Sequence, residues 1–254
     1  MKRCLPLAIA STLALAPWAA AQELDEVIAR HVEARGGATA IRAVEAIRMS
    51  GTLWMGSEIA AQVKLLWKRP NKLRLEVVVE GMTVVQAFDG ETGWAINPLA
   101  GQTDPRPVPA DEARLLEAQA DFVEGPFVDS RSRGYAIEYV GREEVGGTPA
   151  HKLKVTDKRG EVSYVFLDGE TFLEIRSEGK RMMQEEEVEY ETAHRDYRDV
   201  GGLMFAFSVE NRTKGQPVGQ TVTLETIELN VDVSDSEFDM PKPVPAGSDE
   251  EGTE

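Results

Sequence analysis

The sequence predicts a mainly β protein, in which a single curved antiparallel sheet of about 11 strands carries helices on one face. Two observations predict this fold. Apolar and polar residues alternate with a period of two in segments such as Ala61 to Trp67. The pairs Asp89-Gly90 and Asp168-Gly169 separate such segments, and Asp-Gly favours the tight turn of a hairpin. Consecutive hairpins build a meander, so strands that follow one another in sequence are expected to pair.

The N-terminus has the layout of a secretory signal peptide. The basic pair Lys2-Arg3 precedes an apolar run over residues 5–17, and Ala19-Ala20-Ala21 follows as a cleavage motif. The run is shorter than the roughly 20 residues that a membrane-spanning helix needs. The only cysteine, Cys4, precedes the run, so the mature chain is expected to carry no lipid anchor and no disulfide. We therefore predict a signal peptide over residues 1–21 and a soluble periplasmic product.

The rest of the chain is predicted to form one domain over residues 22–241, which is long enough for one sizeable core. The chain has 28 Lys and Arg against 44 Asp and Glu, a net charge of −16 that becomes −18 without Lys2 and Arg3. So acidic a chain does not bind nucleic acid or anionic membranes through a basic face. The acidic segment 242–254 is predicted to be a disordered tail.

Helices are predicted before the sheet. Apolar residues from Leu24 to Val32 follow helical spacing, and Gly36-Gly37 is expected to end that helix. A second, short helix is predicted to carry Ile41, Val44 and Ile47. The N-terminal helix is thus available to cover the apolar face of the sheet.

A loop and a helix interrupt the strands in the middle of the chain. Residues 97–108 are rich in Pro and Gly and predict an irregular loop. Residues 109–122 predict a helix with Leu115, Leu116 and Phe122 on one stripe. A one-sided sheet cannot leave its apolar face in water. We expect this insert and the N-terminal helix to cover the concave face.

No motif for catalysis is visible. The histidines His31, His151 and His194 share no metal-ligand spacing, and the sequence has no nucleophilic serine motif or phosphate-binding glycine loop. Alternating glutamates from Glu185 to Glu191 suggest a calcium site, a carboxylate pair for acid–base chemistry, or a strand with one face in water. The strand is favoured, because calcium ligands usually come from a tight loop. We expect no enzyme activity, no cofactor and no metal.

Large apolar residues cluster in the first half of the chain, where Trp54, Trp67 and Trp94 lie close in sequence. Such residues are usually core residues, but an apolar cavity between sheet and helices is also the usual form of a ligand site. Both interpretations stay open. The candidate walls of a ligand groove are Val63, Leu65, Trp67, Leu75, Val77, Val85, Trp94 and Ile96 on strands, with Leu115, Leu116, Phe122 and Phe127 on the insert.

Several motifs resemble the periplasmic lipoprotein carrier LolA and the wider outer-membrane lipoprotein-sorting family. They are L-W-K-R-P-N at 66–71, D-G-E-T-G-W at 89–94, N-P at 97–98 and F-D-M-P at 238–241. The resemblance implies an incomplete β-barrel whose apolar concave face is closed by a helical lid. It also implies a monomeric carrier without cofactor. Such a carrier takes a lipid, or the acyl chains of a lipoprotein, from an inner-membrane donor toward an outer-membrane acceptor.

The resemblance further gives a role to Arg69, which would link the sheet to the lid and set the balance between open and closed states. A guanidinium can bond several helix-end carbonyls at once. This chain is longer and more acidic than a typical carrier, so lipoprotein, free lipid, isoprenoid and glycolipid all remain possible cargoes. The alternative is a non-catalytic module on the same fold that senses or signals in the cell envelope.

Overall fold

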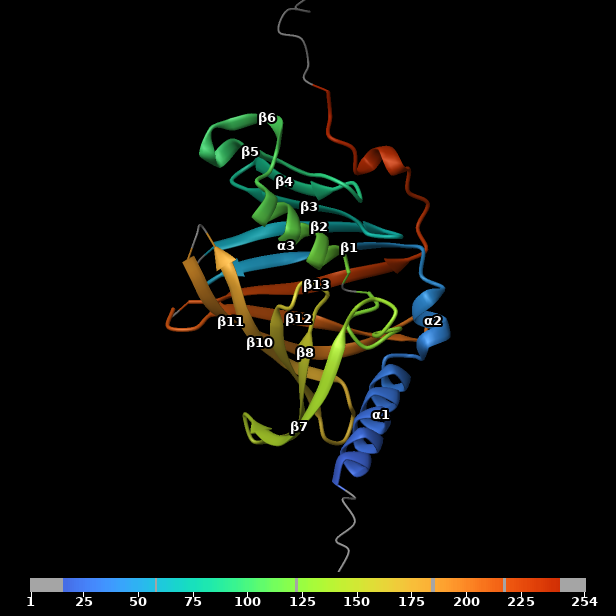
Figure 1. The fold of residues 1–254 in the computed structure, drawn as a ribbon. Helices are drawn as coiled ribbons and strands as arrows, with labels where there is room; N and C mark the ends of the chain where they lie inside the picture. The colour runs from blue at the N-terminus through green and yellow to red at the C-terminus, as the bar shows by residue number, and fades with distance from the viewer. Residues whose placement is uncertain (1–15, 58, 122, 184–185, 217, 243–254) are drawn as a thin grey trace, which may run out of the picture.

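A computed structural model describes residues 16–57, 59–121, 123–183, 186–216 and 218–242. The strands of this part are β1 (Ala46–Met55), β2 (Ile59–Lys68), β3 (Lys72–Val79), β4 (Met82–Phe88), β5 (Gly93–Asn97), β6 (Gln102–Pro107), β7 (Ala136–Val145), β8 (Thr148–Thr156), β9 (Val162–Asp168), β10 (Glu174–Met183), β11 (Glu186–Val200), β12 (Leu203–Thr213) and β13 (Gln220–Leu229). They form one antiparallel sheet of 13 strands in the order β6-β5-β4-β3-β2-β1-β13-β12-β11-β10-β9-β8-β7. The sheet curves strongly but does not close, as Figure 1 shows. The predicted mainly β fold is confirmed.

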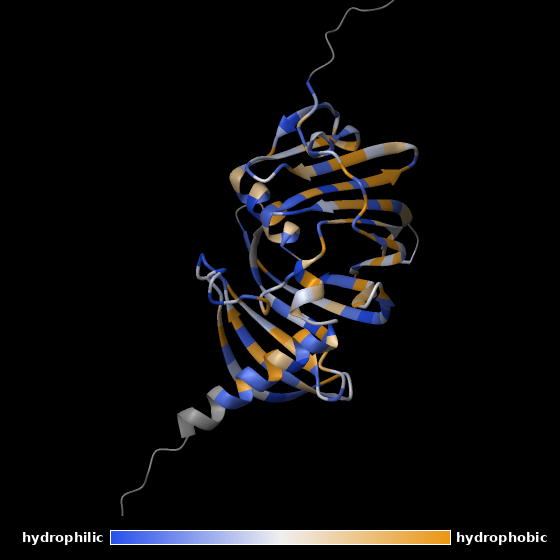
Figure 2. Cartoon of the chain, turned by 90° about the vertical axis from the view of Figure 1, so that its right-hand side faces the viewer, coloured by the Kyte–Doolittle hydropathy of each residue, from blue (hydrophilic) through white to orange (hydrophobic). Residues whose placement is uncertain are grey.

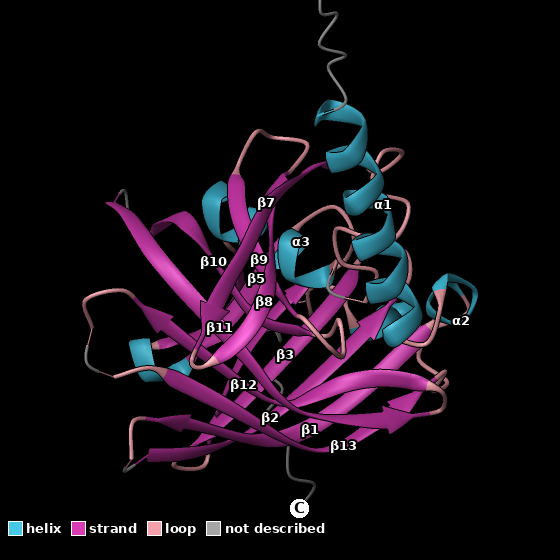
Figure 3. Ribbon diagram, turned by 90° about the horizontal axis from the view of Figure 1, so that it is seen from below, coloured by secondary structure: helices cyan, strands magenta, loops and turns pink. Residues whose placement is uncertain are grey.

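The α-helices are α1 (Ala16–Ala34), α2 (Ala38–Arg42) and α3 (Ala110–Ala120), and α1 and α3 lie on the concave side of this sheet. The short 3-10 helices are η1 (Pro98–Ala100) and η2 (Asp235–Glu237). Figure 3 shows α1 and α3 inside the curve of the strands. Within the described residues, no helix has the length and apolar character needed to cross a membrane.

The glycine pair after α1 allows a close approach that a side chain would block. Gly36 has φ +110°, and a Cβ atom there would lie 2.2 Å from the carbonyl oxygen of Gly202. The end of α1 therefore packs directly on the turn between β11 and β12. This confirms the predicted end of the N-terminal helix.

The sheet has 13 strands, against about 11 expected, and two segments differ from their predicted structure. The short helix α2 ends at Arg42, and Ile47 lies in β1, which pairs with both β2 and β13. The predicted irregular loop 97–108 contains η1 and the edge strand β6. Pro105 and Pro107 are compatible with β6 because an edge strand has backbone N–H positions that need no partner. Both predictions were wrong at these segments.

The hydrophobic core has two large parts, one under each helix. One part joins Leu116 of α3 to Trp67, Leu73 and Phe88 of the sheet, and the other joins Val27 of α1 to residues of β8 and β9. In Figure 2, hydrophobic and hydrophilic positions alternate along the strands, which is the pattern of a sheet with one apolar face. Each half of the sheet therefore buries its concave face under its own helix.

The C-terminal segment covers part of the convex face. Phe238 is fully buried, and its carbonyl oxygen accepts a hydrogen bond from Trp94 Nε1 at 2.7 Å. Lys68 Nζ donates to Asp235 at 2.6 Å. Residues 230–242 therefore form a strap across the outer side of β1–β5. Residues 1–15 of the predicted signal peptide and 243–254 of the predicted tail lie outside the described residues.

The two Asp-Gly-Glu-Thr segments share the same side-chain hydrogen bonds. Asp89 Oδ1 accepts the backbone N–H groups of Glu91 and Thr92 at 2.9 and 2.8 Å. Asp168 Oδ1 accepts those of the two corresponding residues at 2.9 and 2.7 Å. The repeated motif is thus turn chemistry used twice.

Candidate functional site: a concave face, its lid and a cavity

The strand register places five of the predicted wall residues on the concave face. Val63 pairs with Val77, and Leu65 pairs with Leu75. Trp67 lies on the same side and pairs with Leu73. Directly opposed residues in an antiparallel pair share one face. Val63, Leu65, Trp67, Leu75 and Val77 therefore form a continuous apolar surface on β2 and β3.

The other three predicted strand residues lie on the convex face. Val85 pairs with Glu76 and Ile96, while Trp94 pairs with Ala87. The placement follows from the two-residue turn at Glu80 and Gly81, which have φ 51° and 81°. That turn puts Val84, rather than its equally apolar neighbour, on the inner side. Val85, Trp94 and Ile96 instead form a small cluster on the convex face, where Trp94 bonds the strap.

Helix α3, called the lid below for its position, covers the apolar surface of β3–β5 and bonds Trp67 of β2. Asp111 and Glu112 stand in its first turn, where negative charge stabilises a helix. Leu116 is only 2% exposed and belongs to the cluster that contains Trp67. Trp67 Nε1 donates to the carbonyl oxygen of Ala120 at 2.5 Å. The predicted groove is therefore filled at this point by protein side chains.

The remaining insert residues differ in their positions. Leu115 is half-buried, and Phe122 lies outside the described residues. Phe127 belongs to the part of the core under α1, and its ring lies 4.7 Å from that of His31. Of the predicted insert residues that the structure describes, only Leu116 thus belongs to the buried cluster between α3 and the sheet.

Arg69 joins three elements at the end of β2. Its Nε donates to Val44 O at 2.7 Å and a terminal nitrogen donates to Ile41 O at 3.1 Å, both at the end of α2. The other terminal nitrogen donates to Glu124 Oε1 at 2.5 Å, in the loop that follows the lid. The expected bonds to helix-end carbonyls are present, and the ion pair ties them to the lid segment.

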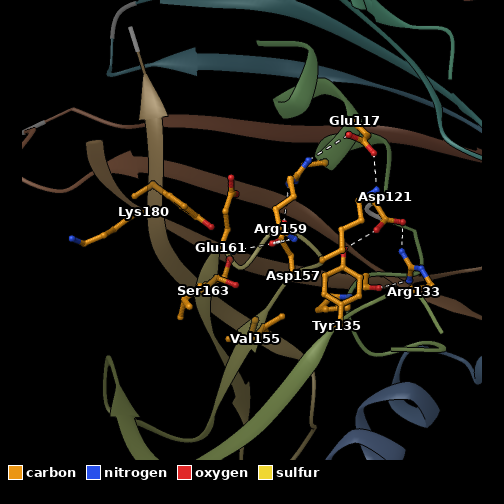
Figure 4. Close-up of a pocket in the computed structure, with 18 of the residues that line it drawn as sticks. Glu117, Asp121, Arg133, Tyr135, Val155, Asp157, Arg159, Glu161, Ser163 and Lys180 are labelled. Carbon is orange, nitrogen blue, oxygen red and sulfur yellow. Dashed lines mark hydrogen bonds and ion pairs between the residues drawn. The ribbon is translucent and has the colours of Figure 1, made fainter. Parts of the chain in front are cut away.

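A cavity lies beside α3, in the other half of the molecule. It has a volume of about 600 Å³ and lies between the C-terminal half of α3, the loop after it and strands β8–β10 (Figure 4). One wall is formed by concave-face residues that include Val155 and Val165. The opposite wall carries charged residues, among them Glu117, Asp121 and Arg159. This cavity is amphipathic, in contrast to the apolar groove predicted from the sequence.

Ion pairs hold the charged wall together. Lys158 Nζ lies 2.8 Å and Arg159 lies 3.4 Å from Glu117, so the turn between β8 and β9 is fixed to the lid. Arg133 pairs with Asp121. Burial raises the pKa of Asp121 even though Arg133 acts in the opposite direction.

The hydroxyl of Tyr135 completes this wall by donating to Asp121 at 2.8 Å. Burial, followed by the neighbouring Asp121 charge, raises the pKa of Tyr135. The phenol therefore stays protonated and acts as a donor within the cavity.

Sequence reasoning did not find this cavity. The segment Lys158-Arg159-Gly160 predicts only a hairpin turn, and no local pattern indicates that it reaches α3. The contact depends on the curvature of the whole sheet, which brings the β8–β9 turn to Glu117. A prediction of it would need long-range pairing information.

The glutamate-rich segment forms cross-strand ion pairs. Glu187 pairs with Lys180 at 2.7 Å and Glu191 pairs with Arg212 at 2.7 Å. In the described part of the chain, no group of three or more His, Cys, Asp or Glu residues is arranged to hold a metal ion. Glu185 lies outside the described residues.

Comparison with known proteins identifies a fold class. No family model and no curated protein matches the sequence. The structure is similar to that of a LolA superfamily protein from Nitrosomonas europaea, with a TM-score of 0.60 and 11% identity, over 85% of this chain and 96% of the other. The class defined by fold is thus the LolA-like half-barrel, as the sequence motifs suggested.

Two further solved structures share this fold. A DUF1329 family protein from Desulfovibrio piger has a TM-score of 0.57 and 11% identity, over 85% of this chain and 96% of its own. A domain assigned to outer membrane lipoprotein sorting, from Vibrio parahaemolyticus, has a TM-score of 0.55 and 10% identity, over 84% and 94%. At such low identity the similarity establishes the fold alone.

Proposed function

We propose that this protein is a non-catalytic periplasmic carrier that binds the acyl chains of a lipid or lipoprotein on its concave face and shuttles them toward the outer membrane. The observation that carries the proposal is the lid. A continuous apolar surface on β2 and β3 is covered by a separate helix, α3. Polar contacts from Trp67 and Arg69 hold that helix and its following loop in place.

Opening of the lid would expose the surface that the acyl chains need. Each CH₂ group transferred from water to this surface contributes about 0.8 kcal/mol, so a long chain can offset the loss of the lid contacts. The fold is that of a domain assigned to lipoprotein sorting, which supports cargo of this class. An exported carrier would begin near Gln22, and the intact mass of the periplasmic protein tests that start.

Titration with a fluorescent fatty acid tests the carrier function. Wild type is expected to bind the probe saturably, and organic extracts of the natively purified protein are expected to contain lipid by mass spectrometry. Leu116→Glu places a charge on the inner side of the lid and is expected to abolish probe binding.

The matched control is Val140→Glu, at a position on the edge strand β7 that is 52% exposed. It is expected to bind the probe like wild type. Three results together would contradict the carrier function: Leu116→Glu unfolds, wild type does not bind the probe, and the extracts contain no lipid. They would show that α3 is an ordinary part of the core.

A further inference from the structure

The amphipathic cavity beside the lid has the layout of a site for the polar end of a ligand. Its volume of about 600 Å³ lies within the range of small-molecule sites. It is continuous with the concave face, because Val155 pairs with Ser163 and Val165 pairs with Ser177 on the inner side of β8–β10. A ligand with its tail under the lid would place its head near this cavity.

The charges of the cavity disfavour an anionic head. Five carboxylates and four cationic side chains line it, so the acids are in excess. Each cation already has a carboxylate partner: Lys158 with Glu117, Arg159 with Asp157 at 3.1 Å, Arg133 with Asp121, and Lys180 with Glu187. A phosphate or carboxylate would have to break one of these pairs and would face the remaining negative charge. A cationic head could donate to the carboxylates but could not accept from the Lys, Arg and Ser donors of the lining, so it would satisfy only part of the cavity.

Hydroxyl groups fit this lining better, because each can both donate and accept. Donors such as Arg159 and acceptors such as Asp157 stand side by side on the charged wall (Figure 4). Ser163 and Ser177 line the opposite side, and Tyr190 adds an aromatic surface there. The Tyr190 hydroxyl lies 2.9 Å from the position that a Cβ atom on Gly179 would take, so its ring occupies the space that the glycine leaves free.

We propose that this cavity binds the head group of an amphiphilic ligand, and that the head group is uncharged and rich in hydroxyl groups, as in a glycosyl- or glyceryl-headed lipid. The proposal rests on the carrier function, since the tail of the ligand is the cargo of the apolar surface. The head would bond the charged wall and the serines, while the tail extends toward β2 and β3.

Displacement of the bound fatty-acid probe by twelve-carbon amphiphiles, each below its micelle concentration, tests the head group. The competitors are dodecyl glucoside, monododecanoylglycerol, dodecyl phosphate and dodecylammonium. We expect the two hydroxylated competitors to displace the probe at concentrations at least about tenfold lower than the two charged ones, a difference of about 1.4 kcal/mol. The order of the two hydroxylated competitors distinguishes a glycosyl from a glyceryl head.

The double variant Ser163→Val, Ser177→Val is expected to reduce this preference to less than about threefold while leaving the affinity for the probe unchanged. Ser208→Val is the control, because Ser208 pairs with Thr223 on the convex face. Equal displacement by all heads, or stronger displacement by dodecyl phosphate, would overturn the head-group proposal and leave the carrier function intact. So would an unchanged preference in the double variant.

If the fatty-acid probe does not bind, direct calorimetric titration with dodecyl glucoside tests the head-group site separately from the carrier function. Glucoside binding without probe binding would support the head-group site and refute the fatty-acid carrier. Absence of both would refute both.

Discussion

The two halves of the sheet are covered by helices in different ways. Helix α1 covers β7–β9 mainly with apolar contacts, and its Val27 and His31 are each only 3% exposed. Helix α3 covers β3–β5 with a shorter apolar face, and polar contacts from Trp67 and Arg69 hold the helix and its following loop. Both helices bury apolar sheet surface, but α3 has 11 residues against 19 in α1, so undocking of α3 would expose the shorter apolar helix face.

This difference suggests that α1 stays docked on its half of the sheet and that α3 is the moving part, which undocks more easily. Local stability follows the amount of apolar surface buried by an element, and elements with few such contacts open at low free energy. Single changes in the two halves should therefore differ in their effect on global unfolding. The predictions below test that contrast.

The largest effect is expected from a matched pair of leucine truncations. Leu153 lies on β8 under α1 and is 0% exposed, and Leu116 lies on the inner side of α3 and is 2% exposed. Leu153→Ala should lower the free energy of unfolding by about 3 kcal/mol, within the range for buried leucines. Leu116→Ala should lower it by only about 1 kcal/mol, because undocking of α3 limits the loss.

Urea denaturation followed by circular dichroism measures both values. Amide hydrogen exchange should also show faster exchange in α3 for Leu116→Ala than for wild type. Equal losses from the two truncations would mean that α3 is as firmly built into the core as α1.

Acid should weaken the α1 half. Burial lowers the pKa of His31 from 6.5 to about 4, and its Nδ1 lies 2.8 Å from Phe172 O. The unfolded chain therefore binds a proton that the folded chain excludes. Stability is full above pH 6.5 and falls between pH 6.5 and 4, by up to about 3 kcal/mol.

The measurement is the free energy of unfolding in urea at pH 7, 5.5 and 4. His31→Gln, which retains a donor for Phe172 O, should remove most of this dependence between pH 6.5 and 4. A variant with the wild-type slope would assign the pH dependence to other groups.

Loss of the Arg69 side chain should destabilise the docking of α3 more than it lowers the global free energy of unfolding. Arg69→Gln removes the ion pair with Glu124 and a bond to the end of α2. Amide exchange in α3 should become about tenfold faster, which corresponds to about 1.4 kcal/mol. Global stability should change by less, and probe uptake should become faster.

The control is Arg48→Gln, since Arg48 is 52% exposed and pairs with Glu228 on the convex face at 3.2 Å. Exposed pairs of this kind contribute about 0–1 kcal/mol, so its α3 exchange should match wild type. Similar exchange in both variants would deny Arg69 a special role in holding the lid.

The sequence predicted those parts of the molecule that local patterns determine. Period-two alternation identified β2 and β3, and Gly36-Gly37 marked the end of α1. The face of Val85 could not be predicted, because Val84 and Val85 are both apolar and only the Glu80-Gly81 turn selects between them. The cavity could not be predicted either, since the contact between Lys158 and Glu117 joins residues that are distant in sequence.

The smallest effect is expected at the two Asp-Gly-Glu-Thr turns, one in each half. Asp89 connects β4 to β5 beside the lid, and Asp168 connects β9 to β10 near α1. Each carboxylate accepts two backbone N–H groups, so Asp89→Ala and Asp168→Ala should each lower the free energy of unfolding by about 1 kcal/mol. The turns belong to one continuous sheet, so equal losses in urea denaturation are expected although the covering helices differ. If Asp168→Ala were costly and Asp89→Ala nearly neutral, β4–β5 would open together with α3, and the moving part would include the edge of the sheet as well as its lid.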